Sequence, residues 1–335
     1  MPNYRINKTD HIDQTNRISF KFDGKTYFGF KGDTLASALL SNGIHLVGRS
    51  FKYHRPRGIM SCGTEEPNAI CQINGDTDLT EPNVRATEIE LYEGLEANSQ
   101  NCWPSVNFDI GAINNFISPF IPAGFYYKTF MWPKSFWYKI YEPIIRKAAG
   151  FGAASIKHDK ERYEHKYEYC DLLIAGTGPS GLASAYAAAK NGAKVILAED
   201  KSRYGGTLLT SEVTIGNQSG QDWAEQIISE LKSMPNVIVK NRSQVFGYYD
   251  HNMLVMSERV SDHLPKTDKY TPKQRLWYIR AKEVVISSGS IERPLVFGNN
   301  DTPGVMLSSA AKEYLKVYGV LVGKKPIIFT NNDSG

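Results

Sequence analysis

The chain has 335 residues, of which 41% are hydrophobic and 22% are charged. This composition is typical of a soluble globular protein with two or three domains. The formal net charge of +4 is spread along the chain without a basic stripe, so nucleic-acid binding is not expected. The sequence has neither an apolar run of membrane-spanning length nor a signal-peptide pattern, so we expect a cytoplasmic protein without membrane contact.

The amino-terminal part is predicted to be a small α+β domain of the β-grasp, ferredoxin-like type that spans residues 15–98. Two runs of β-forming residues flank Asp23-Gly24, a dipeptide that supplies the positive φ angles of a hairpin turn. A helix at 35–40 follows, and further strands are expected at 69–73 and at 87–92. A hairpin followed by a helix is typical of the β-grasp fold.

Residues 99–169 are predicted to be an aromatic-rich connector, with large rings concentrated at 125–137. Rings at this density need a surface that covers them. We favour packing between the two flanking domains. The alternative is a docking face for another subunit, in which Tyr127, Phe130 and Trp132 contact the partner beside a flavin.

The strongest chemical signal is a dinucleotide-binding βαβ unit. A strand at 171–175 precedes Gly176-Thr-Gly178-Pro-Ser-Gly181, and a small-residue helix and a second strand at 194–198 follow. The first glycine permits the tight turn, the second lets the backbone approach a pyrophosphate, and the third allows close packing of helix on strand. The helix N-terminus then attracts the phosphates.

Glu199 follows the second strand, where a carboxylate accepts hydrogen bonds from ribose hydroxyls. A carboxylate at that place disfavours the 2′-phosphate of NADP, so the expected dinucleotide is NAD or FAD. An ordinary surface carboxylate is the alternative role of Glu199. No catalytic and no metal-binding residue is predicted. The predicted cofactor-binding residues are Gly176, Gly178, Pro179, Ser180, Gly181, Glu199, Asp200, Arg203, Gly205, Gly206, Thr207, Ser288 and Gly289.

The remainder of the chain continues the same α/β pattern. The expected elements are a helix at 222–234, a three-stranded meander at 244–249, 254–257 and 275–280, and strands at 283–286 and 326–330. This order resembles the flavoproteins with two dinucleotide-binding domains, which implies a Rossmann-like FAD/NAD(P)-binding domain over 170–335. Because the last strand has no crossover helix to cover it, we expect a fragment of a longer subunit, truncated within this domain.

A second and more specific resemblance covers nearly the whole chain. The stretches that carry it are Gly48–Gly58, Glu65–Asn68, Phe125–Pro133 and Asn331–Ser334. Together with the glycine motif, they make the chain resemble the alpha subunits of the heterotetrameric sarcosine oxidase family.

The resemblance implies that this subunit binds NAD, with FAD as the alternative at Gly176, and that FMN lies at an interface between subunits. It implies beta, gamma and delta subunits as partners. The implied reaction is the oxidative demethylation of sarcosine to glycine with formation of peroxide, at a substrate site on another subunit. The fragment alone is expected to be inactive.

Related amine-oxidising complexes hold a [2Fe–2S] cluster in a similar amino-terminal domain, through closely spaced cysteine thiolates. Cys62 and Cys71 are too few and poorly spaced for this purpose, so we expect a ferredoxin-like domain without an iron–sulfur cluster. The four cysteines of the chain form no CxxC pair, which disfavours a zinc site and a redox-active disulfide.

Two other functions fit the same residues. One is a self-contained FAD-dependent NAD(P)H reductase, and the other is a structural scaffold subunit whose nucleotide has no catalytic role. The chain shows no amine-oxidising constellation, so any chemistry must come from a bound flavin. For His45, His54, Arg55 and Arg57 we favour a structural role over contact with a flavin phosphate.

Overall fold

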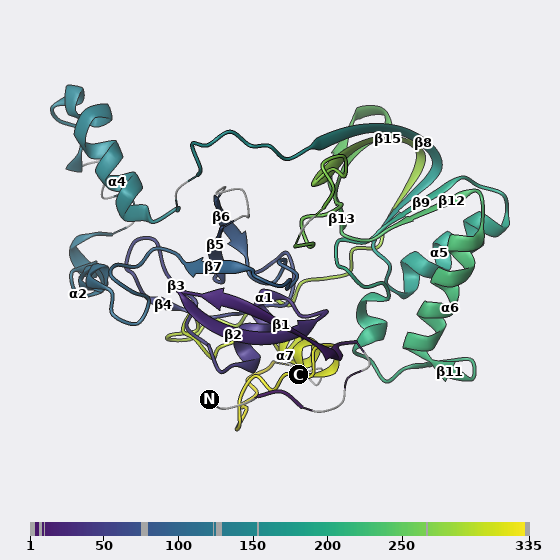
Figure 1. Cartoon of the computed structure of the whole chain (residues 1–335), viewed down its shortest axis with the longest axis horizontal. Coiled ribbons are helices and arrows are strands. Elements are labelled where there is room, and N and C mark those ends of the chain that lie inside the picture. Colours follow the sequence, from purple (N-terminus) through teal and green to yellow (C-terminus); the bar gives the residue numbers. More distant parts are fainter. Residues whose placement is uncertain are drawn as a thin grey trace. The chain divides into compact units, whose positions relative to one another are not determined.

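The computed structural model describes residues 4–6, 9, 11–74, 80–122, 124, 129–152, 154–265 and 267–331. The chain divides into two compact units, residues 1–159 together with 292–335 and residues 160–291, and each unit is described by itself (Figure 1). The predicted domain limits, 15–98, 99–169 and 170–335, stay predictions.

The first unit is built on a five-stranded mixed sheet with the strand order β2-β1-β7-β5-β6. Strands β1 (Asp13–Phe22) and β2 (Lys25–Lys31) form an antiparallel hairpin. Its turn residues Asp23 and Gly24 have φ angles of 48° and 73°, so the predicted hairpin is confirmed. The other strands are β5 (Ile70–Asn74), β6 (Thr80–Arg85) and β7 (Glu96–Ser99), of which β7 runs parallel to β1.

Helix α1 (Leu35–Ser41) follows the hairpin, as predicted, and begins with a capping box. All of its residues are buried, so it forms the centre of this unit's core. The predicted strand at 87–92 is wrong. The backbone there bonds to the start of α1 instead of to the sheet: Ile89 accepts the N–H of Leu35 at 2.8 Å.

The segment after residue 291 packs on the amino-terminal part of the same unit. The carbonyl oxygen of Met60 accepts the N–H of Leu307 at 2.9 Å, and the hydroxyl of Tyr314, within α7 (Ser308–Lys316), donates to the carbonyl oxygen of Ser61 at 2.9 Å. The predicted strand at 326–330 does not form, because the described residues place no strand beside it to accept its hydrogen bonds.

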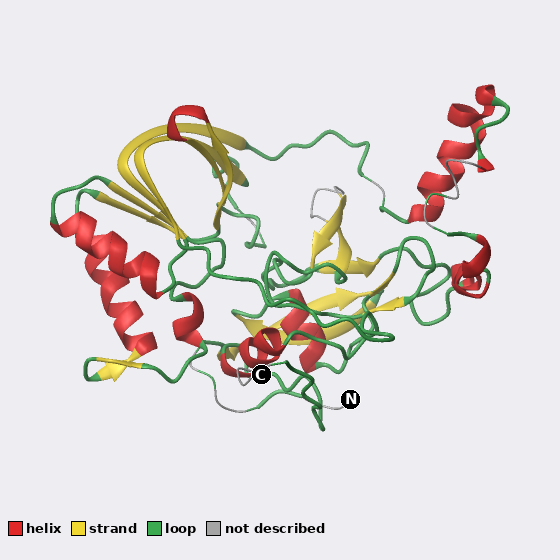
Figure 2. Ribbon diagram, turned by 180° about the vertical axis from the view of Figure 1, so that it is seen from behind, coloured by secondary structure: helices red, strands yellow, loops and turns green. Residues whose placement is uncertain are grey.

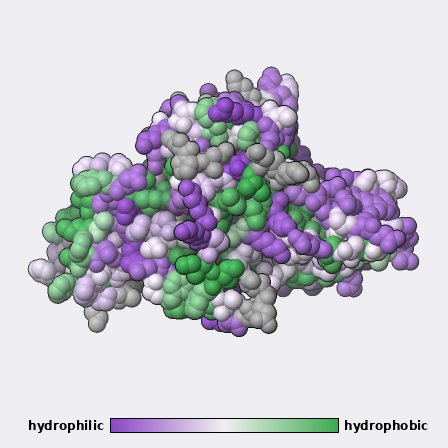
Figure 3. Space-filling view, turned by 90° about the horizontal axis from the view of Figure 1, so that it is seen from below, coloured by the Kyte–Doolittle hydropathy of each residue, from purple (hydrophilic) through white to green (hydrophobic). Residues whose placement is uncertain are grey.

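The connector consists of short helical segments with exposed rings. These segments are Ile110–Ala112, α2 (Ile113–Phe116), Ser118–Phe120, Lys134–Phe136, Trp137–Tyr141 and α4 (Glu142–Ala149). Phe116, Trp132 and Tyr138 are 84%, 83% and 82% exposed. Figure 3 shows hydrophobic residues at the left of the view, the side on which Figure 1 labels α2. The connector therefore leaves these rings uncovered within its own unit, and Phe125, Tyr126, Tyr127 and Lys128 lie outside the described residues.

The second unit contains a six-stranded mixed sheet with the order β12-β9-β8-β15-β14-β13. Strands β8, β9, β12 and β15 are parallel, and β13 and β14 complete the sheet as an antiparallel extension, so the predicted meander is confirmed (Figure 2). The strands are β8 (Tyr163–Ala175), β9 (Val195–Ala198), β12 (Val237–Lys240), β13 (Ser243–Tyr249), β14 (Met253–Arg259) and β15 (Gln274–Ile286). The two strands predicted at 275–280 and 283–286 are one strand, β15, which pairs continuously with β8.

Two helices, α5 (Pro179–Lys190) and α6 (Gly220–Ser233), cover one face of the parallel part of this sheet. Leu182 from α5, Leu231 from α6 and Leu197 from β9 meet in one core cluster. On the other face, Leu173, Met256 and Trp277 belong to a second cluster.

The smaller elements of the chain are β3 (Gly48–Arg49), β4 (Pro56–Arg57), β10 (Thr214–Ile215), β11 (Gln218–Ser219) and the short helical turns Gly206–Leu209 and Asp250–Asn252. Within the described ranges, no helix has the length and apolarity needed to cross a membrane.

Candidate dinucleotide site

The glycine loop lies where β8 ends and α5 begins. Gly176 adopts φ of 104°, and a Cβ atom at this position would collide with the backbone carbonyl of Ser287. A Cβ at Gly181 would collide with the carbonyl oxygen of Gly176. Both positions therefore need glycine because the backbone after β15 and the first turn of α5 approach the loop closely.

Gly178 differs from these two glycines because a Cβ there would meet no atom within 4 Å. It is the N-cap residue of α5, and no side chain of the protein caps the helix. Pro179 stands at the first helical position, and Ser180 is exposed beside it. The open side of the loop thus presents uncapped helix N–H groups and the positive end of the helix dipole, an arrangement that suits a phosphate.

Glu199 directly follows β9 and is only 6% exposed. Its Oε2 atom accepts the backbone N–H of Thr177 at 3.0 Å and also the hydroxyl of Thr177, and its Oε1 atom accepts the N–H of Lys201 at 3.2 Å. The hydrogen bonds of this carboxylate therefore link the glycine loop to the end of β9. A carboxylate offers about four acceptor positions, of which these contacts use three, and a side-chain hydrogen bond with Asp200 engages the group further.

Burial, together with a hydrogen bond and charge repulsion from the neighbouring carboxyl group of Asp200, raises the pKa of Glu199 from 4.5 to about 7. The hydrogen bond from Thr177 acts in the opposite direction. Because the charged form is disfavoured by desolvation, a hydrogen-bond donor that reaches this carboxylate from a ligand would stabilise its ionised state.

The second pair of glycines lies against the first loop. Gly205 donates its N–H to the hydroxyl oxygen of Thr177 at 3.2 Å, and a Cβ at Gly206 would stand 3.0 Å from the Cα of Gly178. Both residues have positive φ angles, 120° and 53°, which favour glycine. Asp200 and Arg203 belong to the segment between Glu199 and these glycines, and Thr207 follows them in a short helical turn.

The turn after β15 completes this edge of the sheet. Ser287 donates its N–H to the carbonyl oxygen of Ala175 at 2.8 Å, next to Gly176, and Ser288 and Gly289 follow it. The structure thus places the predicted residues at the carboxyl ends of three adjacent parallel strands, β8, β9 and β15. This is the edge at which open α/β sheets bind ligands.

Sequence reasoning missed Thr177 and Ser287. Thr177 is fully buried and links Glu199 to Gly205, but it occupies a variable position of the glycine motif. Ser287 contacts the glycine loop through its backbone, and the position of that backbone depends on the pairing of β15 with β8. The small residues from Ser287 to Ser290 were the signal available for this turn.

The parallel strands, the glycine loop and the helix after it make the second unit a Rossmann-like α/β domain. Residues 171–251 match the family model described as FAD dependent oxidoreductase, and residues 15–102 match the model described as 2Fe-2S iron-sulfur cluster binding domain.

The chain is 52% identical over its full length to sarcosine oxidase subunit alpha of Rhizobium meliloti (strain 1021), of which it covers 34%. It is 31% identical to sarcosine oxidase subunit alpha of Corynebacterium sp. (strain U-96), over 96% of this chain and 29% of that protein. The resemblance to sarcosine oxidase alpha subunits is therefore confirmed. The chain spans about a third of the length of the curated relatives that it matches.

Among solved structures, the chain is similar in fold to L-proline dehydrogenase from P. horikoshii. The TM-score is 0.59, with 18% identity over 93% of this chain and 48% of that chain. At this identity the likeness supports the fold alone. It agrees with the mixed sheet and the Rossmann-like unit described above.

The expectation that the amino-terminal domain lacks an iron–sulfur cluster is wrong, because residues 15–102 match a cluster-binding domain model. Counting closely spaced cysteines was too narrow a criterion for recognising this domain. The matched range contains Cys62, Cys71 and Cys102, whereas such clusters are held by four protein ligands. In the part of the chain that the structure describes, no group of three or more His, Cys, Asp or Glu side chains is placed to hold a metal ion. At the glycine loop, the FAD dependent oxidoreductase match favours FAD over NAD.

Proposed function

We propose that the second unit binds FAD, with its pyrophosphate over Gly176 to Gly181 and its adenosine ribose on Glu199. The observation that carries this proposal is the open face at Gly178: no protein atom lies within 4 Å of a Cβ there, and the uncapped N-terminus of α5 faces the same space. Gly205 and Gly206 extend this glycine-rich surface, and Ser288 and Gly289 border it from β15.

Different parts of the site are proposed to bind different groups of the ligand. Backbone N–H groups at the start of α5 bind the phosphates, and Glu199 accepts hydrogen bonds from ribose hydroxyls. Thr177 keeps the Glu199 carboxylate oriented through the two hydrogen bonds that it donates. When bound, the flavin supplies the capacity to accept electrons.

We further propose that this dinucleotide-binding part acts within the alpha subunit of a sarcosine oxidase complex, whose substrate site lies on another subunit. The 52% identity to sarcosine oxidase subunit alpha supports this role. The residues that meet at the glycine loop are suited to holding a nucleotide, and none of those proposed for the site is a histidine or lysine that could act as a general base.

The test begins with the nucleotide carried by the purified protein, which is released by denaturation and identified by chromatography and mass. We expect FAD in stoichiometric amount. A Cβ at Gly178 would meet no atom within 4 Å, so Gly178→Val should fold, place its side chain in the open face and lose its nucleotide. Gly298→Val is the matched control, because Gly298 is equally open and lies in the first unit. Recovery of NAD, or retention of FAD by a folded Gly178→Val variant, would contradict the FAD assignment.

Measurements of enzymatic turnover distinguish the proposed function from the two alternative functions. A self-contained reductase would oxidise NAD(P)H with the purified chain alone, whereas we expect no such activity and no peroxide from sarcosine without partner subunits. A scaffold with a non-catalytic nucleotide would leave the assembled complex active after Gly178→Val, whereas we expect turnover to fall together with nucleotide content.

The connector is proposed to dock a partner subunit. Trp132 is 83% exposed, and its carbonyl oxygen accepts a hydrogen bond from the hydroxyl of Tyr141 at 3.0 Å. The ring of Phe130 packs on Tyr141 with 5.0 Å between the ring centroids. The chain thus holds the backbone of Trp132 in place while its indole is uncovered, which suits an interface anchor. Tyr127, the third residue expected at this interface, lies outside the described residues.

A further inference from the structure

The carboxyl group of Glu199 already has four hydrogen-bond contacts within the protein. Thr177 contributes its backbone N–H and its hydroxyl, and Lys201 contributes its backbone N–H. The fourth contact is the side-chain hydrogen bond with Asp200. Because a carboxylate offers about four acceptor positions, a ribose hydroxyl can reach Glu199 only by taking the place of one of these contacts.

Three of the four contacts are held firmly by the surrounding chain. Thr177 is fully buried, and its hydroxyl oxygen also accepts the N–H of Gly205 at 3.2 Å, so displacing it would disturb both glycine loops. The contact from Lys201 is a backbone N–H group. Asp200 differs, because it contacts Glu199 through a half-buried side chain that has access to solvent. Asp200 is therefore the partner that a ligand can displace most easily.

The contact between the two carboxyl groups depends on a proton. Two ionised carboxylates offer no hydrogen-bond donor and repel one another, so Glu199 and Asp200 form their hydrogen bond only while they hold a proton between them. Burial, this hydrogen bond and the charge of Asp200 raise the pKa of Glu199 to about 7. Loss of the proton leaves two negative charges side by side, and Asp200 is then repelled toward solvent.

Other charged or titratable side chains lie in the segments next to the end of β9. They are Lys201, Arg203, Tyr204, Lys240, Arg242 and Arg259. Arg259 donates to the backbone carbonyl oxygen of Asp200 at 3.3 Å, and Lys240 pairs with the carboxylate of Glu258 at 2.8 Å. Burial raises the pKa of the Tyr204 phenol, which therefore stays neutral. The proton that is exchanged near neutral pH thus belongs to the carboxyl pair.

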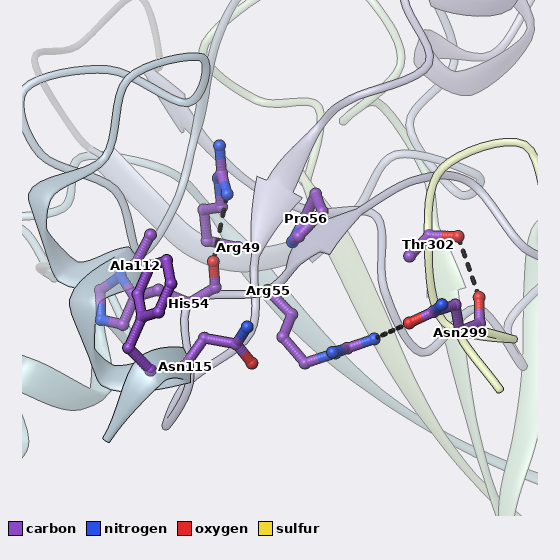
Figure 4. A pocket seen from close by; sticks show the side chains of 9 residues that line it. Arg49, His54, Arg55, Pro56, Ala112, Asn115, Asn299 and Thr302 are labelled. Carbon is purple, nitrogen blue, oxygen red and sulfur yellow. Dashed lines mark hydrogen bonds between the residues drawn. The ribbon is translucent and has the colours of Figure 1, made fainter. Parts of the chain in front are cut away.

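A cavity in the first unit, lined in part by Arg49 and Arg55, offers no comparable contact (Figure 4). Arg49 donates to the backbone carbonyl oxygens of His54 and Val106, and Arg55 donates to the carboxylate of Asp301. These bonds join parts of the first unit to one another between groups that attract. The hydrogen bond between Glu199 and Asp200 joins two groups that repel when both are ionised, so it is poised to break.

We propose that Asp200 is a placeholder for the nucleotide: in the empty site its carboxyl group occupies the position on Glu199 that a ribose hydroxyl takes on binding. This inference rests on the proposed binding of FAD. On binding, the proton of the pair passes to solvent, Glu199 becomes the ionised acceptor of the ribose hydroxyl, and Asp200 moves away. Asp200 therefore weakens nucleotide binding below about pH 7, where the pair is intact, and has little effect above it.

Calorimetric titration of the nucleotide-free protein with FAD, at about pH 6 and about pH 8, tests this role. Asp200→Ala removes the placeholder, so it should bind FAD about fivefold more tightly than the unmodified protein at the lower pH and equally tightly at the higher pH. Asp200→Asn keeps a hydrogen-bond donor beside Glu199 at every pH, so it should bind more weakly than Asp200→Ala at both. Asp250→Ala is the matched control, because Asp250 is exposed in the turn between β13 and β14.

A second measurement needs no ligand. Carbon-13 NMR of the nucleotide-free protein follows the side-chain carboxyl carbon of Glu199, whose signal is identified by its loss in Glu199→Gln. The midpoint of its titration should fall in Asp200→Ala, because burial remains while the neighbouring carboxyl group is removed. An unchanged midpoint would overturn the inference, and so would equal or weaker FAD binding by Asp200→Ala at the lower pH. Failure of the unmodified protein to bind FAD would instead contradict the proposed function.

Discussion

The carboxylate of Glu199 accepts both the backbone N–H and the hydroxyl of Thr177, and both residues are buried. This contact joins the end of β9 to the glycine loop between β8 and α5. It fixes the loop backbone with the open face of Gly178 directed away from the protein core. It also places a buried carboxylate with a raised pKa at the edge where we propose that the ribose binds.

The affinity for FAD should therefore depend on pH through Glu199. Its pKa lies at about 7 in the unliganded protein because the group is buried and lies beside Asp200. Ribose hydroxyls donate to the ionised carboxylate, so binding favours loss of the proton, and affinity should rise by up to about tenfold between roughly pH 6 and pH 8. Titration calorimetry of the nucleotide-free protein at several pH values measures this slope. Glu199→Gln should bind more weakly and show no such slope, and an equal slope in both proteins would contradict the ribose assignment.

The same residue should also affect stability without ligand. The pKa of Glu199 is raised from 4.5 to about 7 on folding, so below pH 4.5 both states are protonated and the carboxyl group makes its full contribution to stability. As the pH rises from about 4.5 to about 7, the unfolded chain loses this proton first. The free energy of unfolding should then fall, by on the order of 3 kcal/mol.

Urea unfolding of the nucleotide-free protein across this pH range measures the change. The comparison protein is Glu199→Gln, whose side chain does not titrate, so the difference in stability between the two proteins should vary over that window and level off above it. A constant difference from pH 4 to pH 8 would show that the pKa of Glu199 is not raised by folding.

Local sequence patterns predicted the conformation of the glycine loop better than the sheet around it. Gly181 is required because the carbonyl oxygen of Gly176 in the same short loop lies against it, so the residue spacing predicts it, whereas Gly176 is crowded by Ser287 after β15. Strand β15 was predicted as two strands, because its continuity depends on pairing with β8, which is distant in sequence. The error at 87–92 has the same origin, since Ile89 bonds to Leu35 at the start of α1.

Cofactor content was the least predictable property. The spacing of Cys62 and Cys71 argued against a cluster, whereas the match over residues 15–102 reflects the whole pattern of the domain. Thr177 was missed for a related reason, because its role becomes visible only when the loop and the end of β9 are placed together in space.

Glu66 should be required for the stability of the first unit. It is 2% exposed, and its carboxylate accepts the backbone N–H groups of Met60, Ser61, Asn68 and Ala69 at 2.9, 2.6, 2.8 and 2.9 Å. In Glu66→Gln, an NH2 group would face N–H donors, leaving buried groups unsatisfied and costing about 3 kcal/mol. The exposed neighbour provides the control: Glu65→Gln should unfold at the same urea concentration as the unmodified protein. Equal stability of both variants would refute this role of Glu66.

Trp132 should contribute to assembly with a partner subunit, a prediction that rests on the proposed function. Its indole is 83% exposed while Tyr141 bonds to its backbone, so removing the ring should leave the fold of the connector unchanged. Large rings at interface centres often supply 2 kcal/mol or more, so Trp132→Ala should weaken assembly by about thirtyfold or more. Tyr270→Ala is the control, since Tyr270 is 66% exposed and lies in the other unit. Assembly is measured by analytical ultracentrifugation of the complex over a concentration series, with circular dichroism to verify folding. Undiminished assembly of a folded Trp132→Ala protein would exclude this ring from the interface, because a buried indole cannot be removed from a protein interface without loss of apolar contact.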